Sequence, residues 1–122
     1  MAFDPVIQWA RIVAAMNERD WATCEALVAD DFNFVVFLGD LYGAIPTVQF
    51  DKVGFMRHGR SLAKRGWQHR SKSMAGLGDT AVTTAEETFD DGSSQLEYAV
   101  VRFNDQGQAV QMYATSPALP GA

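Results

Sequence analysis

Apolar positions recur at helical spacing in three segments of the first half of the chain. The predicted helices cover residues 3–18, residues 21–29 and residues 52 to about 65. Asp4, Asp20 and Asp51 stand just before these segments, where a carboxylate can accept hydrogen bonds from the free N–H groups of a first turn. Pro5 also suits a first turn, because the N–H that proline lacks would have no helical partner there.

The second half of the chain predicts strands separated by turn residues. The predicted strands are residues 67–77, 80–89, 95–103 and 109–115. Their connections are short and rich in Gly, Asp and Asn, which predicts an antiparallel meander. An earlier strand, residues 32–38, is apolar on both parities and is therefore expected to be buried on both faces. Residues 39–50 predict a loop or a short edge strand.

Helices segregated from an antiparallel sheet define an α+β domain. We expect one domain, residues 1–122, with an irregular tail at 116–122. The strand around residues 98–103 is apolar on both parities, so one sheet face would cover the helices and the other would need a cover of its own. The pattern therefore predicts a homodimer packed sheet to sheet.

Charge is unevenly distributed along a chain whose formal net charge is −5. Seven of the ten Lys and Arg residues lie between Lys52 and Lys72, a window that contains no acid. This segment is either a solvated helix face balanced by acidic neighbours or a surface that attracts an anionic ligand. The overall negative charge argues against nucleic-acid binding.

Compartment and membrane association are judged from apolar runs, the first residues and cysteine content. No apolar run reaches the roughly 20 residues that cross a bilayer, and the first residues are acidic where a secretion signal would be basic. Cys24, the single cysteine, excludes an internal disulfide and is expected to fill the core. We therefore expect a cytoplasmic protein that does not bind membranes.

Three stretches resemble the nuclear transport factor 2-like superfamily, in its SnoaL-like and ketosteroid isomerase-like branch. They are NERDWATCEALVADDF (17–32), GDTAV (78–82) and RFNDQGQAVQMYA (102–114). The order and length of the predicted elements match over residues 5–115. The resemblance implies a cone-shaped, curved antiparallel sheet that encloses a pocket with three helices. It does not imply one chemistry, because this superfamily includes isomerases, cyclases, dehydratases, epoxide hydrolases and non-catalytic modules.

The groups of a ketosteroid isomerase are absent from the positions that match them. Such an enzyme uses a carboxylate base together with a tyrosine and a protonated acid that stabilise an oxyanion. The matching positions carry Val36, Ile12 and Ala99. The mechanism of that enzyme is therefore not carried over to this chain.

Other polar residues remain as candidates for proton transfer. Asp40 follows the first strand and could be a displaced general base, or a loop acid in solvent. Glu97 could be a buried acid with a raised pKa, or an edge carboxylate paired with a basic neighbour. His69 could act as an acid or base, or lie on the surface.

The remaining predictions concern the ligand. The resemblance indicates which positions face the pocket, and the expected ligand-binding residues are Phe34, Val36, Arg57, Ala99, Val101 and Met112. Arg57 is included because it matches a position on the third helix where relatives carry a pocket-lining side chain. A pocket lined by these residues favours a hydrophobic or aromatic molecule, and Arg57 could hold an anionic group on it. No metal site and no cofactor are predicted. Two functions stay open, a cofactor-free isomerase, cyclase or dehydratase and a non-catalytic binding or dimerisation module.

Overall fold

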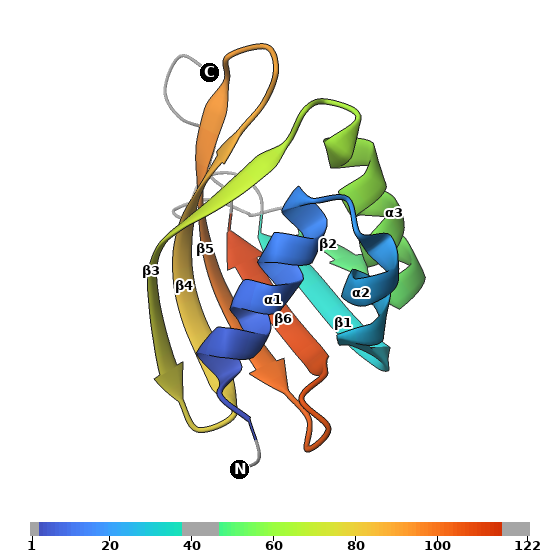
Figure 1. The fold of residues 1–122 in the computed structure, drawn as a ribbon, viewed down its shortest axis with the longest axis vertical. Helices are drawn as coiled ribbons and strands as arrows, with labels where there is room; N and C mark the ends of the chain where they lie inside the picture. The colour runs from blue at the N-terminus through green and yellow to red at the C-terminus, as the bar shows by residue number, and fades with distance from the viewer. Residues whose placement is uncertain (1–2, 38–46, 116–122) are drawn as a thin grey trace.

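The computed structural model describes residues 3–37 and 47–115, which form three helices and one six-stranded sheet. The elements are α1 (Pro5–Asn17), α2 (Trp21–Ala26), β1 (Val28–Phe37), β2 (Thr47–Phe50), α3 (Lys52–Ala63), β3 (Gln68–Leu77), β4 (Thr80–Thr88), β5 (Ser94–Phe103) and β6 (Ala109–Thr115). The helices lie against one face of the curved, open sheet (Figure 1). The predicted α+β fold is confirmed. None of the helices in the described ranges is long and apolar enough to cross a bilayer.

The sheet differs from the prediction in one pairing. Strands β3 to β6 form the antiparallel meander that the turn residues predict. Strand β1, however, runs parallel to β6. Parallel neighbours need a long connection, and here β2, α3 and strands β3 to β5 lie between the two strands in the sequence. The sheet is therefore mixed, in the order β2-β1-β6-β5-β4-β3, and β6 joins the β1–β2 pair to the meander.

Two element boundaries also differ from the prediction. Helix α2 ends at Ala26, not Ala29, because Val28 already pairs with Ala109 of β6. The backbone N–H of Ala109 donates to the carbonyl of Leu27 at 2.9 Å, which ends the helix through a tertiary contact. The end of the predicted loop or edge strand, residues 47–50, forms the edge strand β2.

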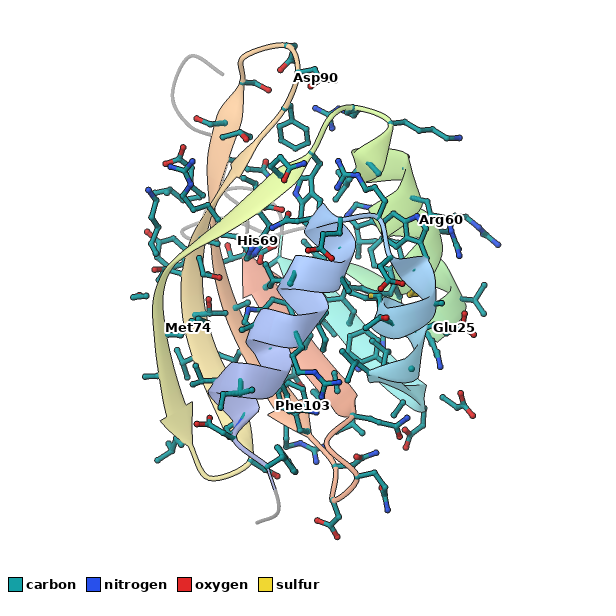
Figure 2. The ribbon with its side chains drawn as sticks, in the orientation of Figure 1. Glu25, Arg60, His69, Met74, Asp90 and Phe103 are labelled. Atoms are coloured by element: carbon teal, nitrogen blue, oxygen red, sulfur yellow. The ribbon has the colours of Figure 1, made fainter. Side chains whose placement is uncertain are left out.

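Helices α1 and α3 cover different parts of the sheet. Helix α1 packs on β3, β4 and β5, with Phe103 near its N-terminal end and His69 near its C-terminal end (Figure 2). Helix α3 packs on β1 and β2. The Phe55 ring of α3 meets the rings of Phe32 and Phe34 at centroid distances of 5.0 and 5.4 Å. These contacts hold the two helices over separate halves of the sheet, and the candidate site lies between them.

Candidate functional site

A cavity of about 260 Å³ lies between the sheet, α1 and α3. Most of its wall is apolar, and its aromatic residues are Trp9, Phe34, Phe50, Phe55, Trp67 and Phe89. Its polar and charged residues are His58, Arg65, His69, Glu87, Gln95 and Glu97. The volume lies slightly below the roughly 300–1,000 Å³ of typical ligand pockets, so the cavity suits a small molecule of one or two rings.

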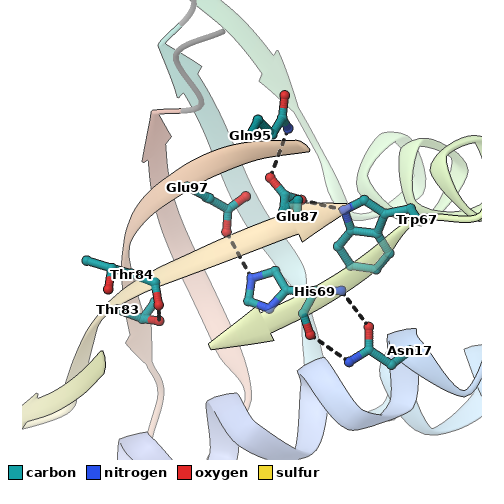
Figure 3. Close-up of polar contacts among 8 residues, drawn as sticks. All are labelled: Asn17, Trp67, His69, Thr83, Thr84, Glu87, Gln95 and Glu97. Atoms are coloured by element: carbon teal, nitrogen blue, oxygen red, sulfur yellow. Dashed lines mark hydrogen bonds and ion pairs between the residues drawn. The ribbon is translucent and has the colours of Figure 1, made fainter. Parts of the chain in front are cut away.

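Strand register brings the acidic residues of the cavity together. On β3 and β4, His69 lies directly opposite Glu87, and Glu87 in turn lies opposite Gln95 of β5. Glu97 is two residues beyond Gln95 and therefore projects from the same face of the sheet. Figure 3 shows His69, Glu87 and Glu97 on three adjacent strands, with Glu97 directed to His69 and Glu87 to Gln95 and Trp67. We call these three residues the acid cluster.

Each member of the acid cluster has a hydrogen-bond partner. The Nε2 atom of His69 lies 3.2 Å from Oε1 of Glu97. Glu87 accepts two hydrogen bonds, one from Nε1 of Trp67 to Oε2 at 2.5 Å and one from Nε2 of Gln95 to Oε1 at 2.9 Å. Within the described residues, Oε2 of Glu97 has no hydrogen-bond donor.

Burial changes the acidity of Glu87. Its side chain is 3% exposed, and burial raises its pKa from 4.5 to about 7. The nearby charge of Glu97 contributes to this rise in pKa, while the hydrogen bonds from Gln95 and Trp67 and the charge of His69 oppose it. Glu87 therefore carries a proton over much of the range below neutral pH, and a general acid is most effective when its pKa lies near the operating pH.

Two residues of the 17–32 stretch that resembles the superfamily hold the backbone beside the acid cluster. The side chain of Asn17 donates to the carbonyl of His69 at 2.8 Å and accepts from its N–H at 2.9 Å. Arg19 adopts a positive φ of 62° and donates from Nη2 to the carbonyl of Trp67 at 2.5 Å. These contacts fix the start of β3 against the end of α1, and so fix the two side chains that reach the carboxylates.

The structure brings most of the predicted site residues to the cavity. Glu97 and His69 line it and are buried. So are the ligand-binding candidates Phe34, Val36 and Met112. Asp40 lies outside the described residues.

Three of the predicted ligand-binding residues do not line this cavity. Arg57 is exposed and does not line the cavity, because the inward face of α3 carries Phe55, Met56 and Gly59. Ala99 and Val101 point to the helix side of the sheet, as their parity predicts, but they are buried in the core and do not line the cavity. The position of Arg57 therefore does not support the prediction that this residue binds an anionic group of the ligand.

The sequence pattern does not identify Glu87 as a cavity residue and does not show whether His58 faces the cavity. Glu87 follows Glu86 in the sequence, and a pair of acids is typical of a solvated face. The signal that identifies it is register. The Asp91-Gly92 turn sets Glu87 opposite Gln95 and thus on the face of Glu97. His58 stacks on Phe50 at a centroid distance of 5.1 Å, and burial lowers its pKa.

A search for metal-ligating clusters gives no site. Among the residues that the structure describes, no group of three or more His, Cys, Asp or Glu side chains is arranged to hold a metal ion. Cys24 is buried, and burial raises the pKa of its thiol to about 11, so it does not supply a thiolate at neutral pH. Apart from Arg65, the titratable side chains among the described residues of the cavity wall are carboxylates and imidazoles.

Comparison with solved structures places this geometry in a known fold. IdmH from Streptomyces antibioticus, named as a candidate polyketide cyclase, is 20% identical with a TM-score of 0.74 over 93% of this chain and 92% of its own. A candidate isomerase of the SnoaL-like family from Agrobacterium tumefaciens is 16% identical, with a TM-score of 0.70 over 91% and 95%. An LEH-like epoxide hydrolase from M. tuberculosis is 13% identical, with a TM-score of 0.69 over 92% of this chain and 81% of its own.

These similarities establish the fold and leave the chemistry open. No protein-family model and no curated protein matches the chain. The chain has the nuclear transport factor 2-like fold in the form found in SnoaL-like proteins, as the resembling stretches predict. The positions matched to the isomerase groups, Ile12, Val36 and Ala99, are buried and apolar. The acid cluster is therefore a different arrangement from the one that defines a ketosteroid isomerase.

Proposed function

We propose that this chain binds a small apolar or aromatic molecule in its cavity and transfers protons on it without a cofactor. The observation that carries the proposal is the acid cluster at one end of an otherwise apolar cavity. An apolar wall binds and desolvates the body of a substrate, while a few polar groups orient it and act on it. Two carboxylates with different environments are a common basis for dividing the roles of acid and base.

Glu97 is the base in this proposal. Its Oε1 atom is held by Nε2 of His69, while Oε2 is left to take a proton from the substrate. The Nδ1 atom of His69 is buried and has no hydrogen-bond partner within the described residues. In this proposal His69 holds Oε1 of Glu97 through Nε2 and so acts on the substrate through Glu97, as a positioning residue.

Glu87 is the acid in this proposal. Its raised pKa of about 7 lets it hold a proton at the pH where Glu97 must be ionised. The substrate would lose a proton to Glu97 and gain a proton from Glu87. Together these two transfers would move a hydrogen from one position of the substrate to another. This is the net change in a cofactor-free isomerisation, and it also serves a cyclisation or a dehydration.

The test uses a small carbon acid, since the natural substrate is not needed to detect proton transfer. Indan-2-one in D₂O exchanges its acidic C–H protons, and NMR follows the loss of the proton signal. We expect the protein to accelerate this exchange and Glu97→Gln to reduce the acceleration by about 100-fold. Glu86→Gln is the matched control, because Glu86 is adjacent on β4 and pairs with Lys72 at 3.4 Å outside the cavity. No acceleration over a protein-free buffer would contradict catalysis of this kind.

A non-catalytic binding module is the second candidate, and one observation favours it. Both oxygens of Glu87 already accept hydrogen bonds from protein groups, as in a carboxylate that only braces the wall. Binding of indan-2-one with no exchange would support this alternative.

We also propose that the protein is a homodimer through the outer face of the sheet. Val82, Val100 and Tyr113 lie side by side in register across β4, β5 and β6, and they are 45%, 41% and 45% exposed. Tyr98 adds to this apolar row at 46% exposure. A contiguous exposed apolar surface of this kind is typical of a protein–protein interface.

A further inference from the structure

The acid cluster has little positive charge near it. Of the residues that line the cavity, Arg65 is the one with a permanent positive charge. Arg65 is exposed, its guanidinium lies 4.2 Å from the centroid of the Phe89 ring, and it is not among the groups that shift the pKa of Glu87. His58, which faces Glu97 from α3, is made less basic by burial, and His69 is charged only when protonated. The two carboxylates are therefore incompletely neutralised by the protein.

The surroundings of the acid cluster suit an organic cation. Glu87 uses one acceptor site on each oxygen for Trp67 and Gln95, and a carboxylate has about four such sites. The walls next to the carboxylates are aromatic, and the face of an aromatic ring attracts a cation. Phe89 already holds a guanidinium in this way at the edge of the cavity.

We propose that the acid cluster receives the protonated nitrogen of a small aromatic or apolar amine, whose apolar body fills the rest of the cavity. This inference rests on the binding part of the proposed function and names the ligand class for the same cavity. When an amine is bound at pH 8, Glu87 is ionised and is not the proton donor. An ammonium group would pair with Glu87 and relieve its repulsion with Glu97. An anion would meet two carboxylates, and a neutral hydroxyl would leave their repulsion unchanged.

The test compares three probes of nearly equal size by calorimetry or NMR titration: 2-phenylethylamine, 2-phenylethanol and 3-phenylpropionate. At pH 8 we expect the amine to bind about tenfold more tightly than the alcohol, and the carboxylate to bind most weakly. At pH 6 the preference for the amine shrinks, because the amine must then displace a proton from Glu87. The primary amine stays protonated at both pH values, so the change reports on the protein.

Matched variants assign the effect to the acid cluster. Glu87→Gln and Glu97→Gln are each expected to abolish most of the preference for the amine, while Glu86→Gln keeps it. Circular dichroism checks that each variant is folded, and the two cavity variants test the same claim independently.

The outcomes separate this inference from the proposed function. Equal binding of alcohol and amine, or tighter binding of the carboxylate, would overturn the amine class and leave an apolar binding cavity in place. Binding of none of the three probes at millimolar concentration would overturn both proposals. A preference for the amine that survives both cavity variants would show that it binds elsewhere and would also overturn the inference.

Discussion

Replacing Glu87 by Gln tests the central electrostatic feature of the cavity through stability alone. The substitution keeps the size and shape of the side chain and removes its ability to ionise. It also keeps one carbonyl oxygen as an acceptor for Trp67, while the pairing with Gln95 must rearrange. The variant therefore separates the effect of charge from the effect of packing.

The magnitude follows from the difference between the folded and unfolded pKa values. The rise from 4.5 to about 7 corresponds to about 3 kcal/mol, at about 1.4 kcal/mol for each tenfold change in proton affinity. Because the folded pKa is raised, this stability is fully present below pH 4.5 and is lost as the pH rises to about 7. Rearranged hydrogen bonding in the variant costs about 1 kcal/mol at every pH. Glu87→Gln should thus be more stable than the parent by about 2 kcal/mol at pH 8, and less stable at pH 4.5.

Urea denaturation followed by tryptophan fluorescence at pH 5, 6, 7 and 8 measures this difference. His58, whose pKa is lowered by burial, contributes its own pH dependence to the free energy of unfolding. Both proteins contain His58, so subtracting the stability curve of the parent from that of Glu87→Gln removes this contribution to first order. Glu86→Gln controls for the loss of a carboxylate on the same strand and should leave the pH dependence unchanged. If Glu87→Gln and the parent lose stability in parallel between pH 5 and 8, Glu87 is not a buried acid with a raised pKa.

Three further outcomes are expected. Val100→Lys places a charge in the middle of the exposed apolar row and should convert a dimer to a monomer in analytical ultracentrifugation; a parent protein that is monomeric at micromolar concentration would remove the dimer proposal. Gly66→Ala should lower the free energy of unfolding by about 1–3 kcal/mol, because Gly66 has a φ of +70° and an added Cβ would collide with Asp90; an unchanged melting temperature would contradict this. Cys24 should resist a thiol reagent at pH 8 until urea unfolds the chain, since burial raises its pKa to about 11; rapid labelling of the folded protein would show that the site opens.

The helices and the meander could be predicted because their signals are local. Asp4, Asp20 and Asp51 each accept a hydrogen bond from a backbone N–H of the following turn, as their positions predict. The turns of the meander also lie where Gly, Asp and Asn interrupt the strands. The parallel pairing of β1 with β6 has no such local signal, since it depends on packing between segments far apart in the sequence.

The candidate site could be predicted only in part, and the reason is again geometric. Parity alone assigns Glu97 to the inner face of its strand, and the structure agrees. To predict that Glu87 faces the cavity, one must know the register of the β4–β5 hairpin. The sequence shows only two adjacent acids, Glu86 and Glu87, a pattern that is typical of a solvent-exposed face. Arg57 was matched to a position in relatives, but a helix position faces inward only if the whole helix is rotated correctly, and α3 turns Arg57 to solvent.

The central place of β6 has a consequence for folding. The last described strand is the one that joins β1 and β2 to the meander, so the two halves of the sheet stay separate until it docks. Pairing of Val28 with Ala109 closes a long loop, which slows folding relative to a domain built from local contacts. The cavity draws Phe34 and Val36 from one half and the acid cluster from the other. Ligand binding should therefore appear in refolding experiments only with the slowest phase, after the helices and the meander have formed.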